Sequence, residues 1–308
     1  MPMDTPATLK ELSDYYAKKQ PHQIDQLTEE TSFLQRVKWE QASHGLWNSF
    51  EEITEIEGAA LVEMNAPLPT VGAASELKKI DLNIFGGEME CPEDKAKMFG
   101  GKEKYFARKM PKILRKSGMS TEKTLLYGNL RAYALDRKGN ALDAGGTGNA
   151  NYSIIALRQV PGETIGLYSP DGFKSGAMFD TMPINGGNIY KDAKGVLVYG
   201  MRLKAYFGYQ IANHETVASI VNIDLATLPT ETMIDDMLDK VRASSASTML
   251  VMHPRLLRAL GTEYKSSRLR MGVGEKNFNT MITHWDDIEV VTTRNMLNGT
   301  EKKVTVKA

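Results

Sequence analysis

The sequence predicts an α+β protein in which a long β-hairpin and a long helix precede a β-rich body and a smaller α/β layer. Three observations lead to this prediction. Residues 51–57 alternate acidic and apolar side chains, which is typical of a strand with one face in water. Residues 92–118 carry helix signals at both ends. Residues 125–223 consist mostly of short runs rich in β-branched and aromatic residues.

Composition excludes several classes of function. The 308 residues are 42% hydrophobic and 25% charged, as in ordinary globular proteins. The 38 basic residues equal the 38 acidic ones, so the whole chain has no strong field for nucleic acid or membranes. A single cysteine, Cys91, excludes an internal disulfide framework and fits a reducing compartment such as the cytoplasm. Neither a signal peptide nor an apolar stretch of about 18 residues is found, so we expect no membrane span.

Residues 8–48 are expected to form a helix or an extended arm, because their apolar pattern is short and broken at Pro21. The segment carries large apolar side chains with too little local sequence to bury them, so we expect them to need a partner surface. These side chains are Trp39, Leu46, Trp47 and Phe50.

Residues 51–91 predict a β-hairpin with a tip of about ten residues, marked by Pro67, Pro69 and Gly72. The second strand is expected to end before Gly86-Gly87. Because an isolated two-stranded hairpin is marginally stable in water, this one should lie against something else.

Residues 92–118 predict a long amphipathic helix. Pro92 suits the first helical position and Gly118 a left-handed cap at the end. Gly100-Gly101 and Pro111 are expected to bend it.

The rest of the chain predicts a β-rich body followed by a small α/β layer over residues 226–300. Strands are expected at 125–129, 132–135, 152–160, 164–169, 195–211 and 217–223. A helix at 228–245, a strand at 247–253, a helix at 254–261, an irregular basic loop at 265–279 and a strand at 288–293 are expected to follow.

The glycine-rich stretch Ala144–Gly148 has the beginning of a dinucleotide fingerprint. Gly146 and Gly148 supply the first glycine pair, but Asn151 occupies the third position, and a strand follows instead of a helix. No Gly-Lys-Ser/Thr follows either, which excludes a P-loop. We therefore expect a tight backbone turn before a strand, with no nucleotide.

No motif in the sequence predicts a catalytic, cofactor-binding or metal-binding residue, and we expect no enzyme and no cofactor. The five histidines, at positions 22, 44, 214, 253 and 284, lack metal-ligand spacing. Asp235-Asp236 and Asp286-Asp287 could be paired catalytic carboxylates, but a solvated helix face or a turn is the more frequent role of such pairs.

The predicted helix carries a basic run that has three interpretations: phosphate binding, a solvated face, or pairing with an acidic surface on another copy of the chain. The third is favoured because the first hairpin strand supplies such a surface. The contact predicted between copies joins Glu51, Glu52, Glu55, Glu57 and Glu63 to Lys102, Lys104, Arg108, Lys109 and Lys112. Lys78 and Lys79 could be donors for a covalent cross-link, although surface charge is the more frequent role of such a pair.

The order of these elements resembles the major capsid protein of tailed phages, the HK97-like shell subunit. Five segments look like the capsid proteins of short-tailed phages of the epsilon fifteen type and their relatives. They are TLLYGN at 124–129, AGGTG at 144–148, IGLYSPDG at 165–172, IVNID at 220–224 and RNMLN at 294–298.

The resemblance implies a domain organisation. Residues 1–50 would be the N-terminal arm and residues 51–91 the extended hairpin called the E-loop. Residues 92–225 would form the peripheral domain, with the spine helix at 92–118, and residues 226–308 the axial domain.

The resemblance also implies a function. The chain would assemble with itself into pentamers and hexamers of an icosahedral head around double-stranded DNA, which it would contact weakly and nonspecifically.

Scaffolding, portal and decoration proteins would be its partners. Because the chain begins directly with a short arm, the scaffold is expected to be a separate protein or absent. Assembly is expected in the bacterial cytoplasm and the final location in the virion. The alternatives are an encapsulin-like compartment and a ligand-binding enzyme that uses the glycine loop.

Overall fold

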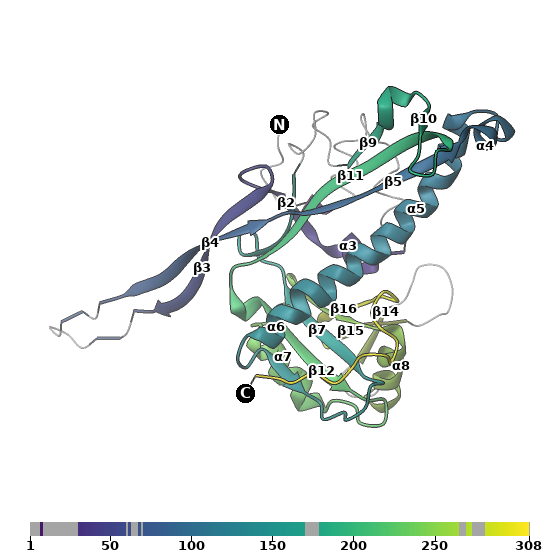
Figure 1. The fold of residues 1–308 in the computed structure, drawn as a ribbon. Helices are drawn as coiled ribbons and strands as arrows, with labels where there is room; N and C mark the ends of the chain where they lie inside the picture. The colour runs from purple at the N-terminus through teal and green to yellow at the C-terminus, as the bar shows by residue number, and fades with distance from the viewer. Residues whose placement is uncertain are drawn as a thin grey trace.

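The computed structural model describes residues 7–8, 30–59, 61–62, 67–68, 70–169, 179–264, 269–272 and 281–307. These residues form two seven-stranded sheets, a two-stranded arm and a long helix that passes between the two sheets (Figure 1). The arm extends away from the rest of the molecule.

The first sheet is organised around its longest strand, β11 (Leu197–Ile211). One edge of β11 pairs with β5 (Asn83–Pro92) from Val198 to Phe207. Its other edge pairs with β8 (Thr164–Tyr168), β9 (Phe179–Pro183) and β10 (Tyr190–Lys191). The sheet is completed by β2 (Lys38–Gln41), which pairs in parallel with β8, and by β1 (Ala7–Thr8).

The arm consists of β3 (Trp47–Glu57) and β4 (Gly72–Asp81), paired antiparallel. The arm therefore begins at Trp47 and ends at Asp81, whereas the hairpin was expected at residues 51–91. Leu82 is a buried residue between β4 and β5, and its backbone N–H donates a hydrogen bond to Leu46 O at 2.9 Å. The following strand β5 joins the first sheet and runs through Gly86-Gly87, where the hairpin was expected to have ended. Tip residues 60, 63–66 and 69 lie outside the described residues.

The expected spine helix is longer than predicted. It consists of α4 (Glu93–Met98), α5 (Lys102–Thr124), a π-helical segment η1 (Leu125–Arg131) and α6 (Ala132–Asp136). The predicted break at Gly100-Gly101 is confirmed, because both residues have positive φ, +76° and +121°. Pro111 lies inside α5 without ending it, and Gly118 is a buried residue of the same helix instead of its cap.

The prediction of strands at 125–129 and 132–135 was wrong, because both segments are helical. Their apolar side chains reach the core at helical spacing: Leu126, Leu130 and Ala134 are fully buried. A run of five residues is too short for its period to distinguish a strand from a buried helical turn.

The second sheet has the order β14-β15-β16-β13-β7-β12-β6. Its strands are β6 (Ala141–Asp143), β7 (Tyr152–Arg158), β12 (Val217–Ile223), β13 (Thr248–Met252), β14 (Leu269–Gly272), β15 (Met281–Trp285) and β16 (Ile288–Thr292). Strands before and after residue 225 thus share one sheet, and the boundary expected there does not separate the two sheets. The basic loop expected at 265–279 contains β14, and its other residues lie outside the described ones.

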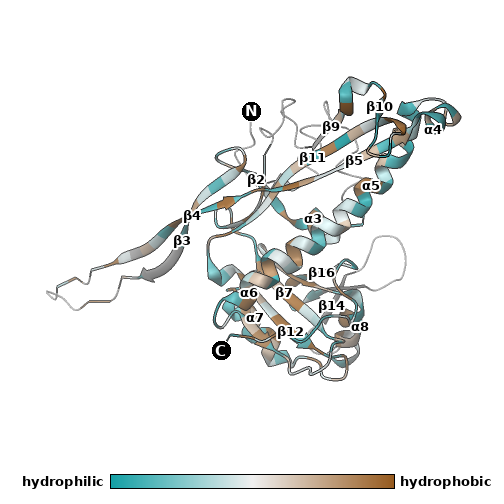
Figure 2. Ribbon diagram, viewed as in Figure 1, coloured by the Kyte–Doolittle hydropathy of each residue, from teal (hydrophilic) through white to brown (hydrophobic). Residues whose placement is uncertain are grey.

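The second sheet is covered on both faces. Along β7, Ile154 belongs to a core shared with α7 (Glu231–Lys240) and α8 (Pro254–Glu263), as the sequence predicted for those helices. The next residue, Ile155, faces the core shared with α5 and η1. Figure 2 shows the apolar positions along these strands, in contrast to the hydrophilic α4 and the first turns of α5.

The N-terminal segment contributes to the same core through the short helix α3 (Ser32–Arg36) and β2. Phe33 and Leu34 are buried there, and the Trp39 ring packs against Phe207 with centroids 5.3 Å apart. The expectation that Trp39 needs another partner surface was therefore wrong, because residues distant in sequence cover it. Residues 1–6 and 9–29 lie outside the described residues.

Candidate inter-subunit surface

The arm exposes large apolar side chains that the described residues of its own chain do not cover. Leu77 on β4 is 77% exposed, and Leu61 and Leu68 near the tip are 106% and 84% exposed. The two strands of the arm pair with each other, and among the described residues no further strand pairs with their outer edges. Exposed leucines on an isolated ribbon are typical of a surface that another molecule covers.

The acidic residues predicted on the arm divide into different environments. Glu51 and Glu57 are exposed, as the proposed contact between copies requires. The side chain of Glu55 and the whole of Glu63 lie outside what the structure describes. Glu52 differs from both, because only 3% of it is exposed.

Glu52 is bound within its own chain. Its carboxylate accepts hydrogen bonds from Lys78 Nζ on β4, from Arg137 Nη2 just after α6, and from the Tyr133 hydroxyl of α6 at 3.3 Å. Burial raises the pKa of Tyr133 to about 12; the Arg137 charge opposes the rise and Glu52 adds to it. Glu52 was predicted to face another copy, and that prediction was wrong, since both neighbouring cations already neutralise it.

The basic side chains of α5 lie opposite its buried face. Lys104, Arg108 and Lys112 recur every four residues and are exposed, so they form one stripe along the helix. The buried face of α5 contains Phe106, Leu114 and Gly118. These positions are also spaced by multiples of four, but they lie two residues further along than those of the stripe, which places them on the opposite side of the helix. Lys109 is exposed beside the stripe.

Lys102 lies apart from this stripe. Its Nζ donates a hydrogen bond to the Gly187 carbonyl oxygen, in η2 (Ile184–Gly187), and lies 5.1 Å from the centroid of the Tyr199 ring. Lys102 thus fastens the start of α5 to the first sheet, and we remove it from the predicted contact.

A single chain does not bring the acidic and basic surfaces together. The arm extends from one end of the first sheet, whereas α4 and the first turns of α5 lie at the other end (Figure 1). A contact between Glu51 or Glu57 and the basic stripe would therefore join two copies.

Lys78 and Lys79, considered as cross-link donors, both have partners on the arm. Lys78 binds Glu52, as described above. Lys79 Nζ lies 2.8 Å from Asp81 Oδ1 and 5.1 Å from the centroid of the Trp47 ring.

Two buried glutamates that sequence analysis did not single out fasten the long helix to distant parts of the chain. Glu122 Oε2 accepts hydrogen bonds from the backbone N–H groups of Phe33 and Leu34, both at 3.2 Å. Its Oε1 accepts from Asn295 Nδ2 at 3.0 Å and from the Thr293 hydroxyl. Burial raises the pKa of Glu122, and these four hydrogen bonds partly oppose the rise.

Glu301 has the same role for η1. It accepts hydrogen bonds from the hydroxyl groups of Tyr127 and Ser153 and lies 3.3 Å from Arg131 Nη2. Burial raises the pKa of this carboxyl too, and Arg131 opposes the rise. Nothing in the local sequence distinguishes Glu122 or Glu301 from the surface glutamates around them, because their donors come from other segments.

The glycine loop between β6 and β7 is a tight turn, as predicted. Gly145 has φ +87°, which other residues rarely adopt. Gly146 approaches the backbone after β12 so closely that a Cβ there would lie 2.4 Å from Asn222 O. The space at the loop is filled by the protein's own backbone.

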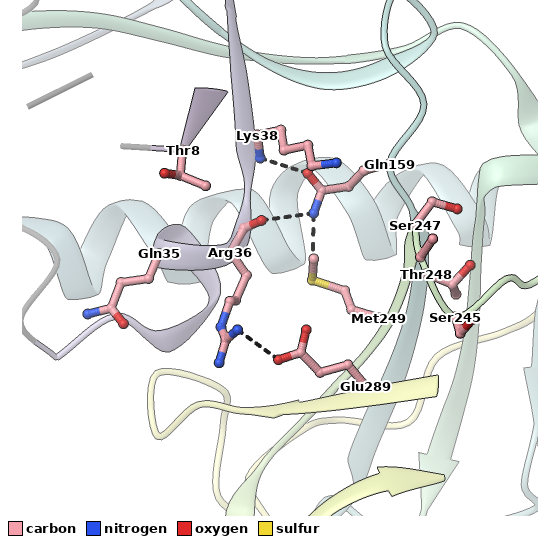
Figure 3. A pocket seen from close by; sticks show the side chains of 11 residues that line it. Thr8, Gln35, Arg36, Lys38, Gln159, Ser245, Ser247, Thr248, Met249 and Glu289 are labelled. Carbon is pink, nitrogen blue, oxygen red and sulfur yellow. Dashed lines mark hydrogen bonds and ion pairs between the residues drawn. The ribbon is translucent and has the colours of Figure 1, made fainter. Parts of the chain in front are cut away.

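A cleft of about 900 Å³ lies between the N-terminal segment and the second sheet (Figure 3). Arg36 Nη1 pairs with Glu289 Oε1 across it at 2.9 Å. The Gln159 amide accepts a hydrogen bond from Lys38 N and donates one to Arg36 O. The polar groups labelled in Figure 3 thus join α3 and β2 to the second sheet.

The histidines and paired aspartates considered as catalytic or metal-binding candidates lie in separate places. His44 stacks on Trp47 with ring centroids 3.9 Å apart, His253 caps α8, and Asp286 has the positive φ of a turn; His22 lies outside the described residues. In the part of the chain that the structure describes, no group of three His, Cys, Asp or Glu residues could hold a metal ion. None of the described helices is both long and apolar enough to cross a membrane.

Solved structures with the same fold are found among phage shells. The structure of bacteriophage Epsilon15 matches with a TM-score of 0.56 at 12% identity, covering 86% of this chain and 88% of that one. The bacteriophage JBD30 capsid matches with a TM-score of 0.55 at 12% identity, covering 92% and 98%. The JBD30 capsid decorated with minor capsid protein trimers matches with a TM-score of 0.50 at 12% identity, covering 84% and 88%. The fold is therefore the HK97-like fold of tailed-phage capsid subunits, as the sequence resemblance predicted.

The family of the chain follows from its sequence. The chain belongs to the family Major capsid protein GP7, which matches residues 104–305, more than half of its length. No curated protein sequence matches it. Membership of a capsid protein family confirms the class of protein that the sequence resemblance implied.

Proposed function

We propose that the chain assembles with itself into pentamers and hexamers of a closed icosahedral head that encloses double-stranded DNA. Family membership and the HK97-like fold support this proposal. The main observation in its support is the arm, whose leucines are left exposed by the part of the chain that the structure describes. In a closed symmetric shell, each copy can cover such a surface on its neighbour.

The contact between copies is proposed to join the arm to the basic stripe of α5. Glu51 and Glu57, with Glu55 and Glu63, would face Lys104, Arg108, Lys109 and Lys112 of another copy. Glu52 and Lys102 are left out of this contact because each is engaged within its own chain.

The remaining expectations belong to the same proposal. Scaffolding, portal and decoration proteins would be partners, assembly would take place in the host cytoplasm, and the chain would have no enzymatic activity. Support for a decoration protein comes from the JBD30 capsid, which carries minor capsid protein trimers and matches this chain in fold. The proposed regions remain the N-terminal arm at 1–50, the E-loop at 51–91, the peripheral domain at 92–225 and the axial domain at 226–308. The extents of the hairpin and of the spine helix are corrected as described above.

The proposal is tested by electron microscopy of the purified chain, expressed alone and with neighbouring phage genes, together with the absorbance ratio for nucleic acid. Closed icosahedral particles containing DNA are expected. Particles that hold protein in place of DNA would favour an encapsulin-like compartment. A monomer under every condition would contradict the proposal, and stabilisation by nucleotides in a thermal-shift assay would then favour a ligand-binding function.

The contact with α5 is tested with the double variant Lys104→Glu, Lys112→Glu. Reversing two charges of the stripe should repel the acidic arm of the neighbour and reduce particle yield. Lys123→Glu is the matched control, since Lys123 is exposed on the same helix but outside the proposed contact. Normal particle yield from the double variant would contradict the contact.

A further inference from the structure

The joint between the arm and the body contains a buried carboxylate with partners on both sides. Glu52 lies on β3 of the arm, and Lys78 approaches it from β4 of the same arm. Arg137 and Tyr133 approach it from the end of α6, which belongs to the body. In the described residues, Glu52 and Arg137 form the ion pair that links the arm to the body.

The position of Glu52 along the arm gives this link mechanical importance. The base of the arm is fixed by the hydrogen bond from Leu82 N to Leu46 O and by that from Asn48 Nδ2 to Gln210 Oε1. Glu52 lies five residues beyond Trp47, where β3 begins, which corresponds to about 15 Å of strand. A ribbon held at its base alone can pivot, whereas a second fixed point at this distance determines its direction.

The arm also changes geometry immediately after Glu52. The register of β3 and β4 shifts between Ile53 and Glu55, which pair with the consecutive residues Ser75 and Ala74. Such a bulge bends and twists the ribbon. The direction of the outer half of the arm thus depends on how the strand is held at Glu52.

The joint combines apolar side chains with the polar contacts of Glu52. An open pocket of about 260 Å³ lies beside Glu52, lined also by Lys78, Tyr133 and Arg137. Its other lining residues include Phe50, Ile80, Ile211 and the buried Tyr209. The ion pair of Glu52 adds a directional link to this apolar contact.

We propose that Glu52 is a positioning residue that latches the arm to Tyr133 of α6 and to Arg137 just after it, and that the direction so imposed sets the curvature, and hence the diameter, of the shell. The inference rests on the proposed function, because curvature has a meaning only for a chain that assembles. In a shell of pentamers and hexamers the copies meet at a small set of recurring angles, so a small spread in the direction of the arm becomes a spread in particle size.

The first test measures the arm of the unassembled chain. Cysteines introduced at Val71, at the outer end of β4, and at Lys123, on α5, are spin-labelled, and the distance between the labels is measured by electron paramagnetic resonance. The native Cys91 is buried and should not react. Glu52→Gln removes the charge that binds Arg137, and Glu76→Gln is the matched control, the same change at an exposed glutamate of β4 outside the proposed contact between copies.

A single narrow distance is expected for the wild type and for Glu76→Gln. Glu52→Gln should lose that single distance, because it removes the charge that binds Arg137. Arg137→Gln breaks the same link from its more exposed side and should give the same result even if Glu52→Gln does not fold. A narrow distance unchanged in Arg137→Gln would overturn the latch.

The second test measures the diameters of assembled particles by electron microscopy. The wild type and Glu76→Gln should give one diameter, and Glu52→Gln and Arg137→Gln should give several. One wild-type diameter in both latch variants would overturn the link between the latch and curvature. A wild type that never closes would instead contradict the proposed function, and the distance measurement would still decide whether the latch exists.

Discussion

The arm and the second sheet are both built from β-strands, yet they keep their apolar side chains in opposite environments. Ile154, Ile155 and Leu157 of β7 are fully buried between layers of helices. Leu77 on the arm is 77% exposed. Other parts of the same chain thus cover the second sheet, whereas the described residues leave the arm exposed. The body can be stable within one chain, whereas the arm depends on contacts from outside it.

The largest expected difference between the two regions comes from one substitution made in each. Leu157→Ala in the body should lower the free energy of unfolding by about 2–5 kcal/mol, because it leaves a cavity in the core. Leu77→Ala on the arm should change the free energy of unfolding of the unassembled chain by less than about 0.5 kcal/mol. Denaturant titration of both variants measures these values. Equal losses would show that the arm folds back and is covered in solution.

The buried carboxylate Glu122 allows a second test of how the body is held together. Glu122→Gln should lower the free energy of unfolding by about 2–4 kcal/mol, because the amide N–H₂ would face donors that now bind a carboxylate oxygen. Glu103→Gln, at an exposed glutamate of the same helix, is the control and should have no effect. If denaturant titration finds the two variants equally stable, the free-energy cost of burying the Glu122 charge would be as large as the stabilisation from its hydrogen bonds.

The glycine loop provides a third test, with two neighbouring glycines in different surroundings. Gly146→Ala should destabilise the chain by about 1–3 kcal/mol, since the new Cβ would collide with Asn222 O. A Cβ added at Gly148 would have its nearest neighbouring atom 3.8 Å away, so Gly148→Ala should be close to neutral. Thermal unfolding compares the two. Equal stabilities would contradict the close approach of the backbone.

The pH dependence of the body is expected to be the smallest effect. Burial, with Arg255, Arg294 and Arg258 nearby, lowers the pKa of His253 from its ordinary 6.5. The neutral ring caps α8 by accepting the Arg255 N–H, so the unfolded chain binds the proton more readily. The stability that this ring contributes should be fully present above about pH 6.5 and fall as the pH drops from there through the lowered pKa. The loss should be at most about 1.4 kcal/mol for each pH unit that separates the folded and unfolded pKa values of His253.

His253→Asn tests the origin of this pH dependence. Asparagine is a good N-cap that does not titrate, so this variant should lose the part of the acid sensitivity that belongs to His253. Unfolding free energies measured at several pH values compare it with the wild type. The same slope in both would show that other groups cause the loss.

The sequence predicted the order of the main elements because each has a strong local signal: β-branched and aromatic runs for β7, β11 and β12, and amphipathic periodicity for α7 and α8. It failed at residues 125–135, where a short apolar run fits both a strand and a buried helical turn. It also failed at the end of the arm, since the point near Leu82 where the chain passes from the arm into the first sheet depends on contacts with the N-terminal segment and with β8.

For the surface between copies, sequence analysis identified residue types correctly and could not judge their environments. Glu51 and Glu52 are neighbours with the same side chain, yet one is exposed and the other buried. The difference comes from Tyr133 and Arg137, which lie 81 and 85 residues further along the chain. The roles of Glu122 and Glu301 were missed for the same reason, because the groups that bind them come together only in the folded chain.

The most direct test of the dependence of the arm on other copies is hydrogen exchange in the unassembled chain and in assembled particles. We expect the amides of β3 and β4 beyond Glu52 to exchange rapidly in the free chain and to become protected in the particle, while those of β7 are protected in both. Equal protection of the arm before and after assembly would contradict the central claim that the arm obtains its stability from other copies.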